Sequence, residues 1–527
     1  MAGGLMQLVA YGAQDLYLTG NPQITFFKTI YRRHTNFSME YIPQYYRVLP
    51  NFSTTQRSQL TVKIDRNADL VHDSYIVFDL PNIYSTSAEK FQWVENLGQN
   101  LIAGVNVTCN GVLIDQQYGQ WMNVWAQLTI DRSKRRAYDE ITGNVWQMQF
   151  PDKYYGNYSP STLPSISGRR LYIPLFFWFC TNPGLSIPLI ALQYTEIYIN
   201  VEFRALNELF TMWYGLSPET LYEFGKSGTS PTAGIPEFDA QLFQAIQDAG
   251  LPEVTAATLV NGLEAEGYGP LNYFWKFVNG GQAPSGLWTQ NSYVFVNYIY
   301  LDEDERRRFA QTSHEYLITQ VQRQEFGGID GPQMLDLKIS QPVKELIFTT
   351  QRTDVYTVNQ WNNYTNCLYY HSLYDVSFVK NAYYFRMERE FFDNNIKPCL
   401  PDVEQQFPRQ TNQFNIDQKN ILFAGNLILN YNERFDLRDS VFFNALEPYQ
   451  YHTNSPDEGI YVYSFGINPE DFQPSGTCNF SRINRAQLYL LMRQVVNTQI
   501  EYNVVVFAHS VNVFRIMGGI GNIVFTN

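Results

Sequence analysis

Apolar and polar residues alternate along most of this chain, and the alternation predicts β-strands. In the clearest run, 195–203, Ile197, Ile199, Val201 and Phe203 occupy every second position, which places them on one face of a strand. Comparable runs are expected to form strands at 61–64, 74–80, 104–109, 112–115, 171–179, 293–300, 343–349, 375–379, 421–429, 460–465, 487–492, 502–508 and 511–516. The pattern therefore predicts an all-β fold built from many short strands.

Two turn signals sharpen this prediction. Asn110-Gly111 separates the runs 104–109 and 112–115, and this dipeptide between apolar-rich runs is the strongest short-range signal for a β-hairpin. Near the other end of the chain, Gly518 and Gly519 stand where the backbone is expected to turn tightly. The Asn110-Gly111 turn would connect two neighbouring antiparallel strands.

Helical spacing appears in two short places. Leu5, Leu8, Val9 and Leu16 precede the Asn21-Pro22 break and predict a short amphipathic N-terminal arm. The segment 121–130 could be a helix or a strand, and its spacing favours a helix. An arm of this kind would contribute little to a core and would have an apolar face to bury elsewhere.

The segment 207–290 interrupts the β pattern. It is rich in Gly, Pro and Ala, it holds two helix-like pieces, and its nine carboxylates and two lysines give it a net charge of −7. We expect a helical hairpin inserted between the strands 195–203 and 293–300, which would pair within one sheet. The ends of the insertion should then lie close together.

Composition and charge exclude some functions. Aromatic residues make up 16% of the 527 residues and charged residues only 17%, below the ~25% that is usual. The net charge of −13 argues against direct nucleic-acid binding, which needs clustered Lys and Arg. A local basic group at Arg132, Lys134, Arg135 and Arg136 is flanked by acids, so a salt-bridged helix or loop is the better interpretation.

The five cysteines, Cys109, Cys180, Cys367, Cys399 and Cys478, are odd in number and form no CxxC pair. Buried free thiols in a reducing compartment are therefore expected, with neither a zinc site nor a disulfide framework. No secretory signal is recognisable, and the apolar run 171–180 is interrupted by Pro174. These features predict a soluble protein made in the cytosol, so host glycosylation of its six N-x-S/T sites is not expected.

Motifs that carry catalysis are incomplete. His314-Glu315 begins like a zinc-protease motif, but Ile318 stands where the second histidine is needed. Gly225-Lys226-Ser227 begins like a phosphate loop, but Thr220 replaces its first glycine. We therefore predict no catalytic, cofactor-binding or metal-binding residues, no cofactor and no enzymatic activity.

A dense charge run covers Asp302, Glu303, Asp304, Glu305, Arg306, Arg307 and Arg308. Paired acids could belong to a glycoside hydrolase, whose two carboxyl groups face a sugar from separate positions. Adjacent acids at the end of a strand do not supply that geometry. A solvated segment, or one that forms salt bridges to another subunit, is the better interpretation.

Several blocks of the sequence resemble one known family. These are GGLMQLVAYGAQDLYLTGNPQITFFKTIYRRHTNFSME (3–40), YIYLDEDERRRFAQTSHEYLI (298–318), QPVKELIF (341–348), ERFDLRDSVFFNALEPY (433–449), IYVYSFGINPEDFQPSGTCNFSRI (460–483) and YNVVVFAHSVNVFRIMGGIG (502–521). In this order they are similar to the major capsid proteins of the nucleocytoplasmic large DNA viruses. Blocks at both ends and in the middle make the resemblance cover most of the chain.

The resemblance implies a double jelly roll, two tandem antiparallel sandwiches of about eight strands each. It implies an N-terminal arm at 1–22, a first jelly roll at 23–311 with the insertion 207–290 facing outward, and a second jelly roll at 312–527. Three copies would form a pseudo-hexagonal capsomer of an icosahedral shell, assembled in the host cytoplasm. Neighbouring capsomers, minor capsid and penton proteins, and an internal membrane at the inner face are the implied partners.

The alternative interpretation is a carbohydrate-binding or carbohydrate-active β-sandwich protein, because aromatic-rich sandwiches often bind sugars and a fold alone does not specify function. A pair of acids in a cleft would favour this alternative. A self-assembling trimer without such a cleft would favour the capsid interpretation.

Overall fold

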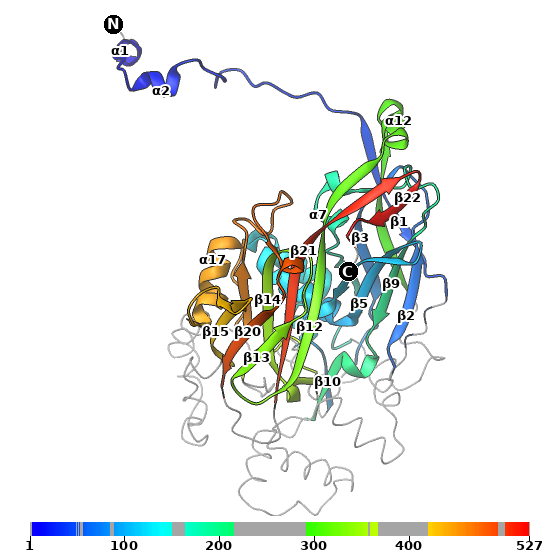
Figure 1. Cartoon of the computed structure of the whole chain (residues 1–527). Coiled ribbons are helices and arrows are strands. Elements are labelled where there is room, and N and C mark those ends of the chain that lie inside the picture. Colours follow the sequence, from blue (N-terminus) through cyan, green and yellow to red (C-terminus); the bar gives the residue numbers. More distant parts are fainter. Residues whose placement is uncertain are drawn as a thin grey trace, which may run out of the picture.

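The computed structural model describes residues 3–48, 50, 52, 56–84, 89–149, 164–214, 291–356, 359–366, 420–493 and 501–525. Within these ranges the protein is dominated by antiparallel sheets that form two sandwiches side by side (Figure 1). Most strands are short and alternate between buried and exposed residues, as a half-buried pleated strand should. The chain is a double jelly roll, as predicted.

The first sandwich has two main sheets. One runs β1 (Phe37–Gln44), β11 (Ser292–Leu301), β3 (Leu70–Asp79) and β7 (Arg170–Pro174), with β8 (Ile187–Pro188) added to β3. The other runs β2 (Ser58–Lys63), β9 (Ile197–Phe203), β5 (Ile102–Cys109) and β6 (Val112–Tyr118). A small pair joins β10 (Phe210–Tyr214) to β4 (Glu89–Trp93). Aromatic rings fill the core between the sheets; Phe52 lies edge-on to both Phe78 and Phe203.

The second sandwich repeats this strand order. One sheet runs β12 (His314–Ile329), β21 (Tyr502–Met517), β14 (Pro342–Arg352) and β18 (Ile460–Ser464), with β19 (Cys478–Asn479) on β14 and β22 (Ile520–Ile523) on β21. The other runs β13 (Gln333–Leu337), β20 (Ala486–Met492), β15 (Leu422–Leu429) and β16 (Asn432–Glu433), with β17 (Arg438–Asp439) on β15. Leu346, Phe348, Leu488 and Val506 belong to the core between them.

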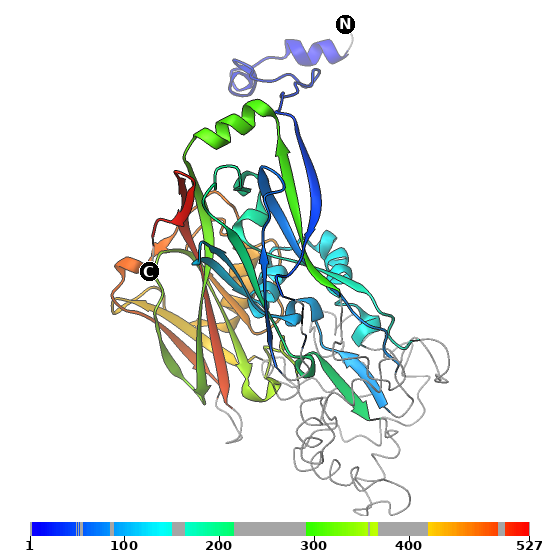
Figure 2. The same cartoon turned by 90° about the vertical axis from the view of Figure 1, so that its right-hand side faces the viewer.

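Helices lie outside the sheets. They are α1 (Gly3–Val9), α2 (Asp15–Thr19), α3 (Leu97–Leu101), α4 (Gly119–Thr129), α5 (Arg132–Thr142), α6 (Trp146–Gln149), α7 (Trp178–Thr181), α12 (Glu303–Gln311) and α17 (Glu447–Tyr451), the last preceded by a π-helical turn at Phe442–Leu446. Figures 1 and 2 show the N-terminal segment with α1 and α2 leaving the body at the end that carries α12. α4 lies between the two sandwiches.

Several local predictions are confirmed. β5 and β6 form the predicted hairpin, with Asn110 and Gly111 at positive φ. The segment 121–130 is almost entirely helical in α4. Gly518 and Gly519, both at positive φ, turn the chain from β21 into β22. The basic group at 132–136 lies in α5, where Arg135 pairs with Asp139 at 3.1 Å.

Other local predictions are wrong. The run 171–179 is not one strand, because β7 ends at Pro174, which has no N–H to donate, and α7 follows. The runs 502–508 and 511–516 form one strand, β21, because His509-Ser510 contains no residue that forces a turn. The apolar pair Phe26-Phe27 also predicts a strand from the sequence, but the first strand of the described residues begins at Phe37. The predicted strand at 375–379 and nearly all of the insertion lie outside the described residues.

The predicted pairing of 195–203 with 293–300 is also wrong. β9 and β11 are strands, but they lie in opposite sheets of the first sandwich. Phe203 at the end of β9 nevertheless lies 5.9 Å, between ring centroids, from Phe78, which is the register partner of Ser292 at the start of β11. The chain therefore leaves one sheet and re-enters the other across the core, a connection that alternation along each strand cannot reveal.

Candidate functional site

The two sandwiches are held together by α4. Its apolar residues Trp121, Val124, Trp125 and Leu128 follow helical i, i+3, i+4, i+7 spacing and form one buried stripe. This stripe packs on the outer face of the β14–β21–β18 sheet, on Ile347, Ile460, Val462, Val505 and Phe507. Because α4 belongs to the first sandwich and the sheet to the second, this cluster joins the two into one body.

Hydrogen bonds reinforce the joint at both ends. The Asp457 amide donates to Gln127 Oε1 at 3.0 Å, and the Trp361 indole N–H donates to the Glu208 carbonyl at 2.8 Å. At the far end, the Tyr194 amide donates to the Gly519 carbonyl at 3.0 Å. Polar and apolar contacts together therefore fix the orientation of one sandwich relative to the other.

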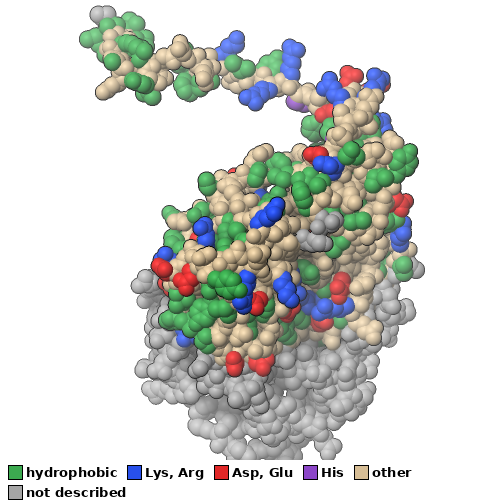
Figure 3. Space-filling model, in the orientation of Figure 1, with side chains coloured by type: hydrophobic (Ala, Val, Ile, Leu, Met, Phe, Trp, Pro, Cys, Tyr) green, Lys and Arg blue, Asp and Glu red, His purple; other side chains and the backbone are tan. Residues whose placement is uncertain are grey.

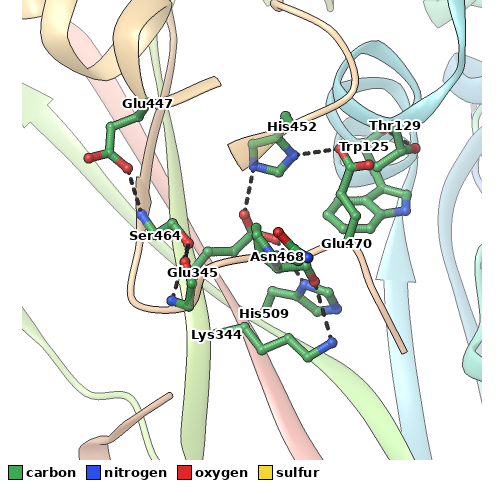
Figure 4. A network of polar contacts seen from close by, with 12 residues as sticks. Trp125, Thr129, Lys344, Glu345, Glu447, His452, Ser464, Asn468, Glu470 and His509 are labelled. Carbon is green, nitrogen blue, oxygen red and sulfur yellow. Dashed lines mark hydrogen bonds and ion pairs between the residues drawn. The ribbon is translucent and has the colours of Figure 1, made fainter. Parts of the chain in front are cut away.

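A buried ionic network lies beside α4 (Figure 4). Glu345, in β14, is fully buried, and its two carboxylate oxygens face different histidines. Its Oε2 lies 2.8 Å from His452 Nε2, and its Oε1 lies 2.9 Å from His509 Nδ1. The other nitrogen of His452, Nδ1, lies 2.8 Å from Glu470 Oε1. The Trp125 ring of α4 stands edge-on to His509 with 4.8 Å between centroids, so the network touches the joint.

The two histidines differ in charge at neutral pH because their surroundings shift their pKa values in opposite directions. Burial disfavours the charged form of His452, but the Glu345 and Glu470 carboxylates outweigh this effect and raise its pKa to about 10. Burial likewise opposes ionisation of Glu345, yet the charge of His452 and hydrogen bonds from both histidines lower its pKa to about 2. Burial lowers the pKa of His509 and its bond to Glu345 offsets this only in part. At neutral pH the network therefore holds ionised Glu345, charged His452 and neutral His509.

Lys344 extends the network. Its buried ammonium group donates to the Asp471 carbonyl at 2.8 Å and to the Pro469 carbonyl at 3.3 Å. With Glu470 facing His452, the loop 465–477 is tied to β14 from two directions. The chemistry of the network suits the fixing of this loop against the joint, because each charged group faces another member or a backbone carbonyl.

Sequence reasoning did not identify this network. Glu345, His452, Glu470 and His509 come from four separate segments, and no short spacing connects them. Three of the four, Glu345, Glu470 and His509, do lie in blocks that carry the family resemblance, namely 341–348, 460–483 and 502–521. A buried acid in an apolar strand pattern was the only available signal.

The N-terminal segment is the most exposed apolar part of the described chain. Neither α1 nor α2 contains a buried residue. Its large apolar side chains are exposed, namely Leu5, Met6, Leu8, Val9, Tyr11, Leu16, Tyr17, Leu18, Ile24, Phe26, Phe27, Ile30 and Tyr31. Three basic residues lie among or directly after these apolar ones, namely Lys28, Arg32 and Arg33. Figure 3 shows basic and hydrophobic side chains along the same segment. Exposed apolar surface of this extent is typical of interaction sites.

The outer face of the β1–β11–β3–β7 sheet carries a second apolar surface, here called the aromatic face. It consists of Tyr41, Tyr75, Tyr172, Tyr293 and Phe295, all partly or well exposed. Tyr41 stacks on Phe295 with 5.3 Å between centroids, and Tyr293 stands edge-on to Phe295 at 6.0 Å. Stacked, half-exposed rings are typical of protein interfaces.

The sequence motifs that were rejected as catalytic lie in structural positions. His314 and Glu315 begin β12, where Glu315 pairs with Arg515 at 2.7 Å. In the 302–308 charge run, Arg306 pairs with Asp69 at 3.0 Å, and Arg307 pairs with Glu303 within α12. Arg306 and Arg307 therefore have partners within the chain. The segment Gly225-Lys226-Ser227 lies outside the described residues.

Other features bear on the alternatives. The described residues contain no group of three or more His, Cys, Asp or Glu side chains that could hold a metal ion. Among the same residues no helix is long and apolar enough to cross a membrane. A surface cavity of about 410 Å³ lies between the ends of β1 and β2, lined in part by Arg47, Lys63 and Asp65. Asp65 is the one carboxylate in its lining, so this cavity lacks the acid pair that a glycoside hydrolase needs.

Of the five cysteines, Cys109, Cys180 and Cys478 are free thiols in the described residues. Cys109 is buried, and burial raises its pKa to about 12. Cys180 and Cys478 are partly buried, so the expectation of buried thiols holds fully only for Cys109. Cys367 and Cys399 lie outside the described residues.

Comparisons with known proteins agree with the fold. Two family models match in tandem: major capsid protein N-terminus over residues 25–235, and large eukaryotic DNA virus major capsid protein over residues 305–522. The major capsid proteins of Phaeocystis pouchetii virus and Pyramimonas orientalis virus are 34% and 32% identical, and each alignment covers 100% of both chains. The quasi-atomic model of the PBCV-1 virus capsid is similar with a TM-score of 0.62 and 25% identity, covering 95% of this chain and 100% of that chain.

Proposed function

This chain belongs to the major capsid proteins of the nucleocytoplasmic large DNA viruses, and from that premise we propose that three copies assemble into a pseudo-hexagonal capsomer that tiles an icosahedral shell. As a member of the family, the protein is a structural component of the capsid shell of the virion. The proposal concerns how copies of it are arranged.

The repeated strand order carries this proposal. β1-β11-β3-β7 in the first sandwich corresponds to β12-β21-β14-β18 in the second, and β2-β9-β5-β6 corresponds to β13-β20-β15-β16. Two similar sandwiches per chain, joined rigidly through α4, give a trimer six similar units around one axis. Such a trimer has a nearly hexagonal outline and can tile a surface through similar edges.

We propose the division of the chain into an arm at 1–22, a first jelly roll at 23–311 and a second at 312–527. The two sets of sheets support it, because strands from β1 to β11 and strands from β12 to β22 do not share a sheet. Residues 3–36 supply no strand and expose their apolar side chains, which supports binding of the arm to neighbouring capsomers, minor capsid or penton proteins, or an internal membrane. Shell formation requires no catalytic step by this chain.

Electron microscopy of negatively stained protein tests the proposed capsomer. Class averages viewed along the particle axis should show a hexagonal outline with three-fold symmetry. Obligate interfaces of this kind typically bury more than ~2,000 Å² in total, so the particle should survive dilution on the grid. Single two-lobed particles in every class would contradict the proposal.

A further inference from the structure

The joint made by α4 provides an internal example of how one jelly roll binds another. α4 lies between β6 and β7 of the first sandwich and covers the outer face of β14, β21 and β18 in the second. The contact is tight. The ring centroids of Trp121 and Phe507 lie 5.4 Å apart, and Ile347 and Val505 in the same cluster are almost completely buried. An apolar helical stripe on an apolar sheet face is therefore the mode of contact that this chain already uses.

Each half of this contact has a counterpart in the other sandwich. The strands β3, β11 and β7 occupy the places of β14, β21 and β18. In register, Tyr75 pairs with Phe295 and Pro174, just as Ile347 pairs with Phe507 and Val462. The aromatic face is thus the equivalent, in the first sandwich, of the sheet face that α4 covers in the second.

The equivalence extends to the polar end of the two faces. Two residues before Tyr75 in β3 stands Asp73, and two residues before Ile347 in β14 stands Glu345. Glu345 is fully buried beside the α4 joint and faces two histidines, whereas the Asp73 side chain is 28% exposed and faces His72 at 3.5 Å. The face that α4 covers buries its carboxylate fully, whereas the aromatic face leaves its carboxylate partly exposed.

The counterpart of α4 is the helical segment 441–451, which comprises the π-helical turn and α17. α4 lies between β6 and β7, and the segment 441–451 lies between the corresponding strands β16 and β18, after the short extra strand β17. Phe443 and Glu447 bury one side of it against the second sandwich. The other side exposes an apolar stripe of Val441, Ala445, Leu446 and Tyr449, here called the α17 stripe, in which Tyr449 is 80% exposed.

We propose that the α17 stripe of one copy covers the aromatic face of the next copy, as α4 covers the second sandwich within one chain. The proposal rests on the trimer proposed above and specifies which surfaces form it. Figure 1 places α17 at the edge of the molecule remote from β1, so one copy cannot satisfy both surfaces itself. The contact is head-to-tail, and such contacts generate a ring when the rotation closes. In such a trimer, the α4 contact within each chain and the proposed contact between chains alternate around the axis.

Native mass spectrometry of surface variants tests this contact. Leu446→Asp combined with Tyr449→Asp places two charges on the α17 stripe, and Tyr293→Asp places one on the aromatic face. Both variants should lose the trimer at micromolar concentration while far-UV circular dichroism stays that of the wild type. The matched control is Tyr431→Asp, which changes a 76% exposed tyrosine in the β15–β16 hairpin and should leave the trimer intact.

The outcomes separate the two proposals. A wild-type protein that is not a trimer would overturn the proposed function itself. A wild-type trimer that persists in either surface variant would overturn only the pairing of α17 with the aromatic face. Hydroxyl-radical footprinting of the wild-type trimer gives an answer even where a variant misfolds: Tyr449 and Tyr293 should be protected and Tyr431 labelled, and strong labelling of Tyr449 would contradict the contact.

Discussion

Glu345 is the residue on which the buried network depends. Replacing it by Gln keeps the shape but leaves the His452 imidazolium without its fully buried counter-charge. Breaking one side of a buried ion pair typically costs about 3 to 5 kcal/mol, so Glu345→Gln should lower the free energy of unfolding by about 3 kcal/mol in chemical denaturation. The matched control is Glu315→Gln, which removes an exposed pair with Arg515 and should cost less than about 1 kcal/mol. Equal effects of the two substitutions would contradict this account.

The same network predicts a pH dependence. The pKa of Glu345 is lowered to about 2 from 4.5, so its stabilisation is present above pH 4.5 and is lost as the pH falls toward 2. The pKa of His452 is raised to about 10 from 6.5, so its stabilisation is complete below pH 6.5 and is lost as the pH rises through 10. The lowered pKa of His509 acts in the opposite sense, weakening the fold as the pH falls below 6.5.

The free energy of unfolding of the wild type minus that of Glu345→Gln isolates these contributions. Measured against pH, this difference should be largest between about pH 4.5 and 6.5, where the stabilisation from ionised Glu345 and from charged His452 is complete. It should shrink above pH 10 and toward pH 2. A difference that stays constant across the whole range would show that Glu345 acts through packing and not through charge.

At the scale of elements, the N-terminal arm is predicted to be dispensable for folding. Deleting residues 2–20 removes α1 and α2, neither of which buries a residue in its own chain. The truncated protein should therefore melt within a few degrees of the full chain in differential scanning calorimetry. Its assembly into larger arrays should be impaired if the exposed apolar side chains of the arm bind neighbouring molecules, as proposed above. A truncated protein that fails to fold would place the arm in a core.

The elements themselves were largely predictable, and their partners were not. Asn110-Gly111 specified the β5–β6 hairpin because that turn is encoded by two adjacent residues. The spacing in 121–130 favoured a helix, which α4 confirms, but the stripe that α4 buries against the second sandwich was not predicted. The assignment of β9 and β11 to one sheet failed, since alternation gives the faces of a strand but not the sheet that it joins. The buried network escaped prediction for the same reason, because its members meet only through long-range pairing.

At the scale of the whole molecule, the α4 joint and the repeated strand order both support the proposed trimer, in which six similar sandwiches surround one axis. Two sandwiches fixed in one orientation can close a ring of six only if each chain meets its neighbour much as its own halves meet. The exposed α17 stripe and the aromatic face are where that contact is expected. The presence of two tandem sandwiches follows from the family resemblance, whereas the order of strands in each sandwich, and the surfaces that this order leaves open, became visible only in the folded chain.

Native mass spectrometry of the purified full-length protein tests the central claim most directly. The chain has a mass of 61.2 kDa, and the account predicts a single dominant species of three chains across micromolar concentrations. The trimer should persist on dilution, because obligate interfaces of this size dissociate slowly. A spectrum that contains only the 61.2 kDa monomer at every concentration would contradict the account.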